Sequence, residues 1–142
     1  MGSPLNDAQH VARYCRPTTI LEDGSVSHGA FILRREKDPP ETYLSVYWLE
    51  HFAGANAEER LVELRPAIPA TGLKLSKKGK LAILNVGNTR TVVRDRSANK
   101  RLLPIIVEPP PPFHVGIWDT LTDEDAIANA IRDSVLSYAP CT

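Results

Sequence analysis

The sequence contains few cysteines, and they lie far apart. Cys15 and Cys141 are the two cysteines among 142 residues, and no Cys-x-x-Cys pair is present. Small secreted domains held by disulfides carry more cysteines at closer spacing. Residues 1–4 also lack the basic and apolar regions of a secretory signal. We therefore expect two free thiols in a cytoplasmic protein, with Cys141 on a mobile chain end.

Long apolar runs and net charge are also missing. No apolar run approaches the roughly 18 to 20 residues that a membrane-spanning helix needs, so no membrane-spanning segment is predicted. Basic and acidic residues number 17 each, which makes the formal net charge zero, and 42% of residues are hydrophobic. This composition is typical of a globular domain and excludes a disordered chain. The length fits one domain over residues 1–142.

Several functional motifs are absent. The sequence has no Walker-type phosphate loop, no Gly-x-Gly-x-x-Gly and no Gly-x-Ser-x-Gly, which removes support for NTPases, dinucleotide enzymes and α/β-hydrolases. The four histidines, His10, His28, His51 and His114, form none of the short spacings that are typical of zinc sites. We therefore predict no metal site and no cofactor.

Proline and glycine clusters divide the chain into short extended segments. Six of these segments have the apolar content of strands: residues 10–15, 30–34, 81–86, 89–94, 102–108 and 113–117. Short loops between neighbours favour antiparallel pairing, and Gly87-Asn88 favours a tight hairpin turn. Pro104 cannot donate to a ladder, so residues 102–108 are predicted to start late or lie at a sheet edge. The proline run at 109–112 is predicted to be a stiff connector, although its Pro-x-x-Pro pattern also fits a ligand of a proline-binding groove.

Two further segments have helical patterns. Residues 123–138 carry apolar side chains at helical spacing, and Thr122 with Asp125 resembles a capping box. Residues 57–64 follow Asn56, a candidate N-cap. The sequence therefore predicts an α+β fold: a mostly antiparallel sheet of about five to six short strands, a C-terminal amphipathic helix packed on one face, and one or two shorter helices.

Residues 43–52 fit either a strand or a helix. Alternating apolar side chains permit a strand, whereas Leu44, Trp48 and Phe52 share a face if the segment is helical. Ser45, which can cap a helix, favours a short helix after Leu44. The aromatic content of the segment indicates a contribution to the hydrophobic core.

The zero net charge hides an uneven distribution. Residues 65–101 hold 10 basic side chains and one acidic side chain, whereas residues 1–64 and 102–142 are net acidic. A basic segment is typical of surfaces that contact phosphates or acidic proteins. The predicted binding residues are Lys74, Lys77, Lys78, Lys80, Arg90, Arg94 and Arg96.

The predicted hairpin would align the arginines of this segment. Alternate residues of a strand point to opposite sides, so Arg90, Arg94 and Arg96 would form one row. This row predicts a binding protein for nucleic acid or an acidic protein surface, with self-association through the acidic C-terminal third as a further possibility. The segment contains no aromatic residue for base stacking. Acidic residues from either end of the chain can instead fold over it as ordinary ion pairs.

A few residues are candidates for catalysis. His10 and Tyr14 fall on one face of a predicted strand, which places an acid–base group with a hydrogen-bond donor. His114 lies near Asp119 in the sequence, and together with Cys15 they match the roles in a cysteine hydrolase. The competing explanation is that His114 is a core or edge histidine with its hydrogen bonds satisfied and that Cys15 is a small buried apolar residue. The alternative function is therefore a small enzyme that acts on a phosphate-bearing or amide substrate through His10, Tyr14 and His114.

Overall fold

A computed structural model describes residues 2–98 and 100–142. Within these residues, one six-stranded antiparallel sheet packs against three α-helices, which confirms the α+β class. The strands are β1 (His10–Cys15), β2 (Leu44–Trp48), β3 (Lys80–Asn85), β4 (Ile105–Val107), β5 (His114–Ile117) and β6 (Ser137–Pro140). The helices are α1 (Ala57–Ala67), α2 (Val86–Arg96) and α3 (Glu124–Ser134). Met1 and Asn99, the second of which falls in the basic segment 65–101, lie outside the described residues.

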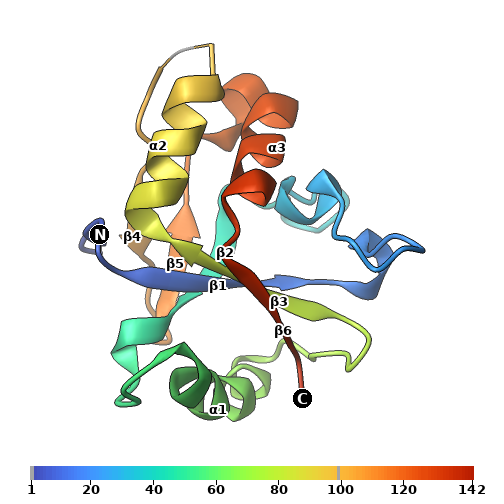
Figure 1. Cartoon of the computed structure of the whole chain (residues 1–142), viewed down its shortest axis with the longest axis vertical. Coiled ribbons are helices and arrows are strands. Elements are labelled where there is room, and N and C mark those ends of the chain that lie inside the picture. The colour runs from blue at the N-terminus through green and yellow to red at the C-terminus, as the bar shows by residue number, and fades with distance from the viewer. Residues whose placement is uncertain (1, 99) are drawn as a thin grey trace.

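The sheet has the strand order β4-β5-β2-β1-β3-β6, so β2 and β1 occupy its centre. Helices α2 and α3 lie side by side on one face of the sheet, and α1 lies on the other (Figure 1). Every strand pair is antiparallel. The result is a three-layer arrangement in which both faces of the central strands are buried.

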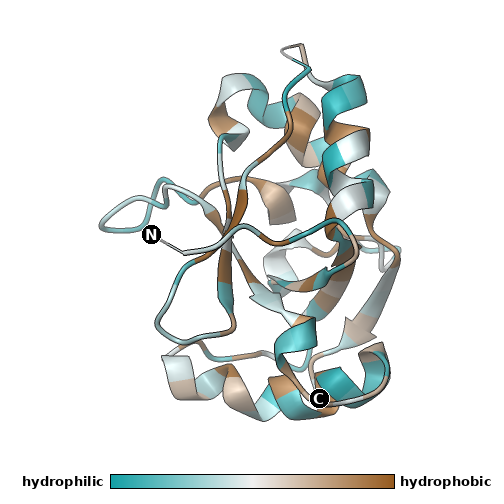
Figure 2. Ribbon diagram, turned by 90° about the vertical axis from the view of Figure 1, so that its left-hand side faces the viewer, coloured by the Kyte–Doolittle hydropathy of each residue, from teal (hydrophilic) through white to brown (hydrophobic). Residues whose placement is uncertain are grey.

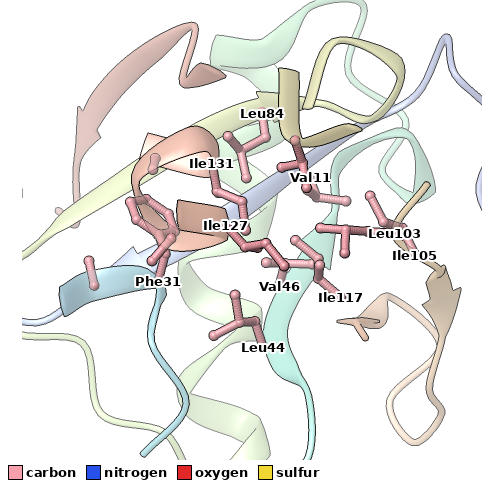
Figure 3. Packing of buried hydrophobic residues seen from close by; sticks show 14 of the residues in the cluster. Val11, Phe31, Leu44, Val46, Leu84, Leu103, Ile105, Ile117, Ile127 and Ile131 are labelled. Carbon is pink, nitrogen blue, oxygen red and sulfur yellow. The ribbon is translucent and has the colours of Figure 1, made fainter. Parts of the chain in front are cut away.

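Two hydrophobic clusters fill the two sides of the sheet. The larger cluster lies between the sheet, α2 and α3, and includes Val11, Val46 and Ile131 (Figure 3). The smaller cluster lies towards α1 and includes Leu64 and Leu81. Hydrophobic residues accordingly concentrate on the strands, while the projecting loops are mostly hydrophilic (Figure 2). Each fully buried aliphatic side chain stabilises the fold by about 1.5 to 3 kcal/mol.

The predicted hairpin at Gly87-Asn88 is wrong, because its second strand is the helix α2. The side-chain oxygen of Asn85 accepts a hydrogen bond from the backbone N–H of Asn88 (2.8 Å), which caps the first turn. Val86 and Val93, seven residues apart, lie on the buried side of the helix. A helix cap directly after a strand therefore accounts for the residues that the hairpin prediction assigned to a turn.

Residues 43–52 contain a central strand, so the short helix favoured from the sequence is wrong. Strand β2 lies between β1 and β5, and a 3-10 turn at Leu49–His51 follows it. Leu44 and Val46 belong to the larger cluster, whereas Tyr47 belongs to the smaller one. The alternation of Leu44, Val46 and Trp48 on one side is that of a strand, and the capping role assigned to Ser45 is what misled the prediction.

The predicted strand at residues 30–34 is also wrong. His28–Phe31 forms a 3-10 turn, and Phe31 is fully buried in the larger cluster. This turn packs against α3. A short apolar run cannot be assigned to a strand by its pattern alone, and here packing of Phe31 against the core decides its conformation.

The C-terminal helix is shorter than predicted. It ends at Ser134, and the following residues form β6, which pairs with β3 at the edge of the sheet. The predicted capping box is not formed, because the Thr122 hydroxyl donates to the carbonyl oxygen of Asp119 instead. Strand β6 carries Cys141 into the smaller cluster, where it is 3% exposed, so this residue is not on a mobile end.

Other predictions are confirmed. Residues 10–15 form β1, and β4 starts at Ile105, directly after Pro104, at the edge of the sheet. The side chain of Asn56 caps α1 by accepting a hydrogen bond from the backbone N–H of Glu59 (2.9 Å). Helix α1 continues past the predicted end of residues 57–64, with Pro66 inside its last turn.

Candidate functional site

A cleft opens beside the two central strands, where their pairing stops. Strand β1 pairs with β3 at six positions but with β2 at two, Val11 with Trp48 and Ala12 with Tyr47. The cleft has a volume of about 260 Å³ and is lined by residues from β1, β2 and β5 and from three loops. The lining residues are Arg13, Tyr14, Arg16, Arg34, Lys37, Glu41, Ser45, Tyr47, Thr71, Leu73, Pro110, Pro111 and His114.

The side chain of Arg13 lies where β1 and β2 separate. Its Nε donates to the carbonyl oxygen of Ala30 (3.0 Å) and its Nη1 to that of Ser45 (2.9 Å). The residue is 9% exposed, and burial lowers the pKa of its guanidinium. No carboxylate of the described residues lies within 4 Å of it. Because a guanidinium has five N–H donors, Arg13 keeps unused donors at the cleft.

The rim of the cleft carries more positive than negative charge. Arg16, Arg34 and Lys37 line it, against Glu41 as the single carboxylate of the described lining residues. Glu41 is engaged, because its Oε1 accepts the backbone N–H of Arg34 (2.6 Å) and its Oε2 lies 4.0 Å from Nζ of Lys37. Within residues 2–98 and 100–142, Arg16 has no carboxylate within 4 Å. Its positive charge also lowers the pKa of Arg13.

A serine and a histidine face each other in the cleft. Nε2 of His114 lies 3.1 Å from Oγ of Ser45, and Nδ1 lies 2.9 Å from the carbonyl oxygen of Glu108. A carbonyl oxygen can only accept a hydrogen bond, so Nδ1 carries a proton and its N–H donates a hydrogen bond to the backbone carbonyl oxygen of Glu108. In the neutral ring, Nε2 is therefore the acceptor for the Ser45 hydroxyl. The Ser45 hydroxyl thus donates to Nε2 of His114, which is the direction of hydrogen bonding that a nucleophile–base pair requires.

Tyrosine and proline side chains provide the less polar wall. The hydroxyl oxygen of Tyr14 accepts the backbone N–H of Ser76 (3.1 Å), which holds the ring in place. Burial raises the pKa of Tyr47 to about 12, so its hydroxyl stays protonated. Pro110 and Pro111, from the connector between β4 and β5, line the same cleft. The cleft thus combines cations with apolar surface.

Two of the three residues of the predicted enzyme alternative lie at the cleft. Tyr14 and His114 both line it, whereas His10 does not. Nδ1 of His10 lies 2.7 Å from Oε2 of Glu50, and its backbone N–H donates to Oε1 of the same carboxylate (2.7 Å). His10 and Tyr14 lie four residues apart on the strand, a separation of about 13 Å in extended chain.

The predicted arrangement of Cys15, His114 and Asp119 is not formed. Cys15 is fully buried, its Sγ donates to the carbonyl oxygen of Arg13 (3.6 Å), and burial raises the pKa of its thiol to about 11. Asp119 is bound instead by Arg101 (2.8 Å). His114 directs its two ring nitrogens to other partners, so the described residues contain no cysteine–histidine pair at this site.

The three arginines of the predicted basic hairpin lie on α2, and each contacts a carboxylate. The ion pairs are Arg90–Asp7 (3.2 Å), Arg94–Asp95 (3.3 Å) and Arg96–Asp133. Arg90 also donates to the carbonyl oxygens of Leu5 (3.0 Å) and Leu103 (3.1 Å). Two of the three carboxylates come from the acidic ends of the chain, as the alternative of internal pairing predicted.

The lysines of the predicted basic surface differ from these arginines. Nζ of Lys80 donates to a backbone carbonyl oxygen across the fold. Lys74, Lys77 and Lys78 are exposed in the loop before β3, and no carboxylate in the described part of the chain lies within 4 Å of them. The loop begins beside Leu73, which lines the cleft. Lys74 follows Leu73 directly in the sequence, so the loop that carries these lysines begins at the cleft.

The sequence analysis missed Ser45 and the cleft cations Arg13, Arg16, Arg34 and Lys37. They fall in residues 1–64, whose net charge is negative, so the overall sum hid them. Counting charges over a shorter segment would have revealed them, because residues 13–37 contain five basic and three acidic side chains. The pairing of Ser45 with His114 had no such signal, since 69 residues separate them.

Within the described residues, no group of three or more His, Cys, Asp or Glu side chains is placed to hold a metal ion. No helix in that part of the chain has both the length and the apolar character to cross a membrane. Comparisons with protein-family models, curated proteins and solved structures found no match.

Proposed function

We propose that the protein binds a small phosphate-bearing molecule in the cleft between β1 and β2. One observation carries this proposal: Arg13 and Arg16 line the same cleft, and no carboxylate of the described residues lies within 4 Å of either. Burial is the main cause of the lowered pKa of Arg13; the charge of Arg16 adds to the lowering and the charge of Glu41 opposes it. A bound anion would stabilise the charged form of both guanidinium groups in the cleft.

Phosphate fits these residues for geometric reasons. A guanidinium can donate two parallel hydrogen bonds to the oxygens of one phosphate or carboxylate group. The donors of Arg13 are held in position by the carbonyl groups of Ala30 and Ser45, so little side-chain entropy is lost on binding. The volume of about 260 Å³ suits a small metabolite, with Tyr47 and Leu73 against its less polar part.

Titration calorimetry with inorganic phosphate and adenosine monophosphate tests the proposal, with adenosine as the uncharged ligand and succinate as the carboxylate ligand. The variant Arg16→Gln removes one cleft cation without touching the core. We expect both phosphate ligands to bind, adenosine to bind much more weakly, and Arg16→Gln to weaken phosphate binding roughly tenfold or more.

Arg101→Gln is the matched control, because Arg101 is exposed, pairs with Asp119 and does not line the cleft. It should bind phosphate as the unchanged protein does. Tighter binding of succinate than of phosphate would assign the cleft to carboxylates. Absence of binding by the unchanged protein, or equal loss in both variants, would refute an anion site between β1 and β2.

A second candidate is contact with nucleic acid or an acidic protein surface through Lys74, Lys77 and Lys78. These side chains are exposed, and no carboxylate of the described residues lies within 4 Å of them. Retention on heparin and binding of a short labelled nucleic acid should then fall steeply with salt. Replacing the three lysines with glutamine should remove this binding, whereas Arg90→Gln with Arg94→Gln should not, because both arginines contact carboxylates.

A further inference from the structure

We infer that Ser45 and His114 form a nucleophile–base pair that hydrolyses esters whose acyl group carries a phosphate or carboxylate. This inference rests on the proposed anion site, because the anion is what would place the ester in the cleft. It adds a reaction and a nucleophile to that site. Ser45, His114 and the cleft cations Arg13 and Arg16 all line the same cavity.

The hydrogen bonds fix the direction of proton transfer. Nδ1 of His114 donates to the backbone carbonyl of Glu108 (2.9 Å), so Nε2 of the neutral ring has a free lone pair. That lone pair faces Oγ of Ser45 at 3.1 Å. Ser45 is thus the nucleophile, His114 the base, and the backbone carbonyl of Glu108 the group that positions the base. Other enzymes use a carboxylate in this third position.

The sheet holds both side chains rigidly. Ser45 is paired with Gly116, and Tyr47 with His114, in the β2–β5 ladder, so Ser45 and His114 are diagonal neighbours on one face. The rings of Tyr43 and Tyr47 lie 5.8 and 6.2 Å from the His114 ring. A pair on adjacent strands of a central sheet keeps its geometry better than a pair on loops.

Arg13 connects this pair to the anion site. Its Nη1 donates to the backbone carbonyl oxygen of Ser45 (2.9 Å), and the side chains of both residues line the cleft. Positive charge held in a cleft stabilises the oxyanion that forms when a hydroxyl attacks a carbonyl. Arg16, also at the cleft, remains for the anionic end of the acyl group.

The proposed reaction uses water and no redox step. Oγ of Ser45 attacks the ester carbonyl carbon while Nε2 of His114 takes the hydroxyl proton, which gives a tetrahedral oxyanion. Its collapse breaks the ester C–O bond, and the alcohol leaves with the proton from Nε2. Water then attacks the acyl-serine while Nε2 takes a proton from it. The free acid leaves, and Ser45 regains its proton from Nε2.

The positioning group limits the substrate to esters. A carboxylate would stabilise the imidazolium that forms during attack, whereas the neutral carbonyl of Glu108 stabilises it less. An amide leaving group must be protonated before it can leave, so it depends more on that stabilisation than an activated ester does. We expect cleavage of activated esters and no cleavage of amides.

The test uses the mono-para-nitrophenyl ester of adipic acid, whose acyl group ends in a carboxylate too far from the ester to expel nitrophenolate itself, and the uncharged para-nitrophenyl hexanoate. Release of nitrophenolate is followed by absorbance, and the acylated residue is located by mass spectrometry of digested protein. We expect turnover of the charged ester, a transient acyl group on Ser45, and slower turnover of the uncharged ester. Ser45→Ala should lower the rate about a hundredfold or more and remove the adduct. Ser25→Ala, at an exposed turn, is the matched control and should keep the full rate.

Phosphate titration of the same proteins separates this inference from the proposed function. A protein that binds phosphate but shows no ester cleavage above the buffer rate overturns the reaction and leaves the anion site standing. Cleavage that persists in Ser45→Ala, or equal rates for the charged and uncharged esters, also overturns the inference. A protein that binds neither phosphate nor succinate, and that cleaves neither ester, overturns both proposals.

Discussion

Arginines in two regions of this molecule differ in what surrounds them. On α2, Arg94 and Arg96 are exposed and each has a carboxylate partner. In the cleft, Arg13 is buried and has carbonyl partners, and Arg16 has no carboxylate within 4 Å among the described residues. The α2 region is richer in positive charge along the sequence, yet its arginines have carboxylate partners, whereas Arg13 and Arg16 have none within 4 Å among the described residues. Local neutralisation, rather than density along the chain, therefore indicates where an anion would bind.

The largest expected effect is on stability, at Arg13. Replacing Arg13 with methionine keeps much of the volume but leaves the carbonyl oxygens of Ala30 and Ser45 without their donor. We expect a loss of about 3 kcal/mol in the free energy of unfolding, measured by urea denaturation, because each unsatisfied buried acceptor costs about 1 to 3 kcal/mol. Arg101→Met, at an exposed ion pair, should cost less than about 1 kcal/mol. Equal stability of the two variants would mean that Arg13 does not hold the cleft together.

The next effect concerns pH, through the thiol beside Arg13. Burial raises the pKa of Cys15 from about 9 to about 11, so the folded protein favours the protonated thiol more than the unfolded chain does. The protonated thiol therefore contributes its whole stabilising effect to the free energy of unfolding below pH 9, and this effect is lost as the pH rises towards 11. Urea denaturation between pH 8 and 11 should show a decline on the order of 2 kcal/mol from this group.

Cys15→Ala should reduce that alkaline decline, whereas Arg94→Gln on α2 should leave it unchanged. The positive charge of Arg13 opposes the effect of burial on the thiol. Removing it in Arg13→Met should therefore move the titration of Cys15 to still higher pH. An alkaline decline that is identical with and without Cys15 would show that the thiol is not buried beside Arg13.

Local signals made part of the fold predictable. Pro104 indicated the late start and edge position of β4, and Asn56 indicated the start of α1, because both act through their own backbone groups. Strand β2 and helix α2 were mistaken for the opposite element. In β2 a possible cap at Ser45 outweighed the alternating apolar side chains, and at Asn85 a helix cap occupied the place of a turn.

The candidate site was less predictable, because it depends on tertiary structure. Tyr14 and His114 were identified by residue type, and both line the cleft. Ser45 was not identified as the partner of His114. The two residues are far apart in the sequence and become neighbours only because β2 pairs with β5. The cleft itself arises where β1 and β2 separate, which no residue pattern within either strand encodes.

The smallest expected effect is at Arg94, and it tests the comparison most directly. Arg94 and Asp95 are adjacent and exposed, so their ion pair is screened by water and salt. Arg94→Gln should change the free energy of unfolding by less than about 0.5 kcal/mol and leave phosphate binding unchanged. Arg16→Gln has the same change in net charge and should weaken phosphate binding while leaving stability similar. If calorimetry instead gave both variants the same loss of phosphate affinity, total charge would govern binding and the distinction between the two regions would fail.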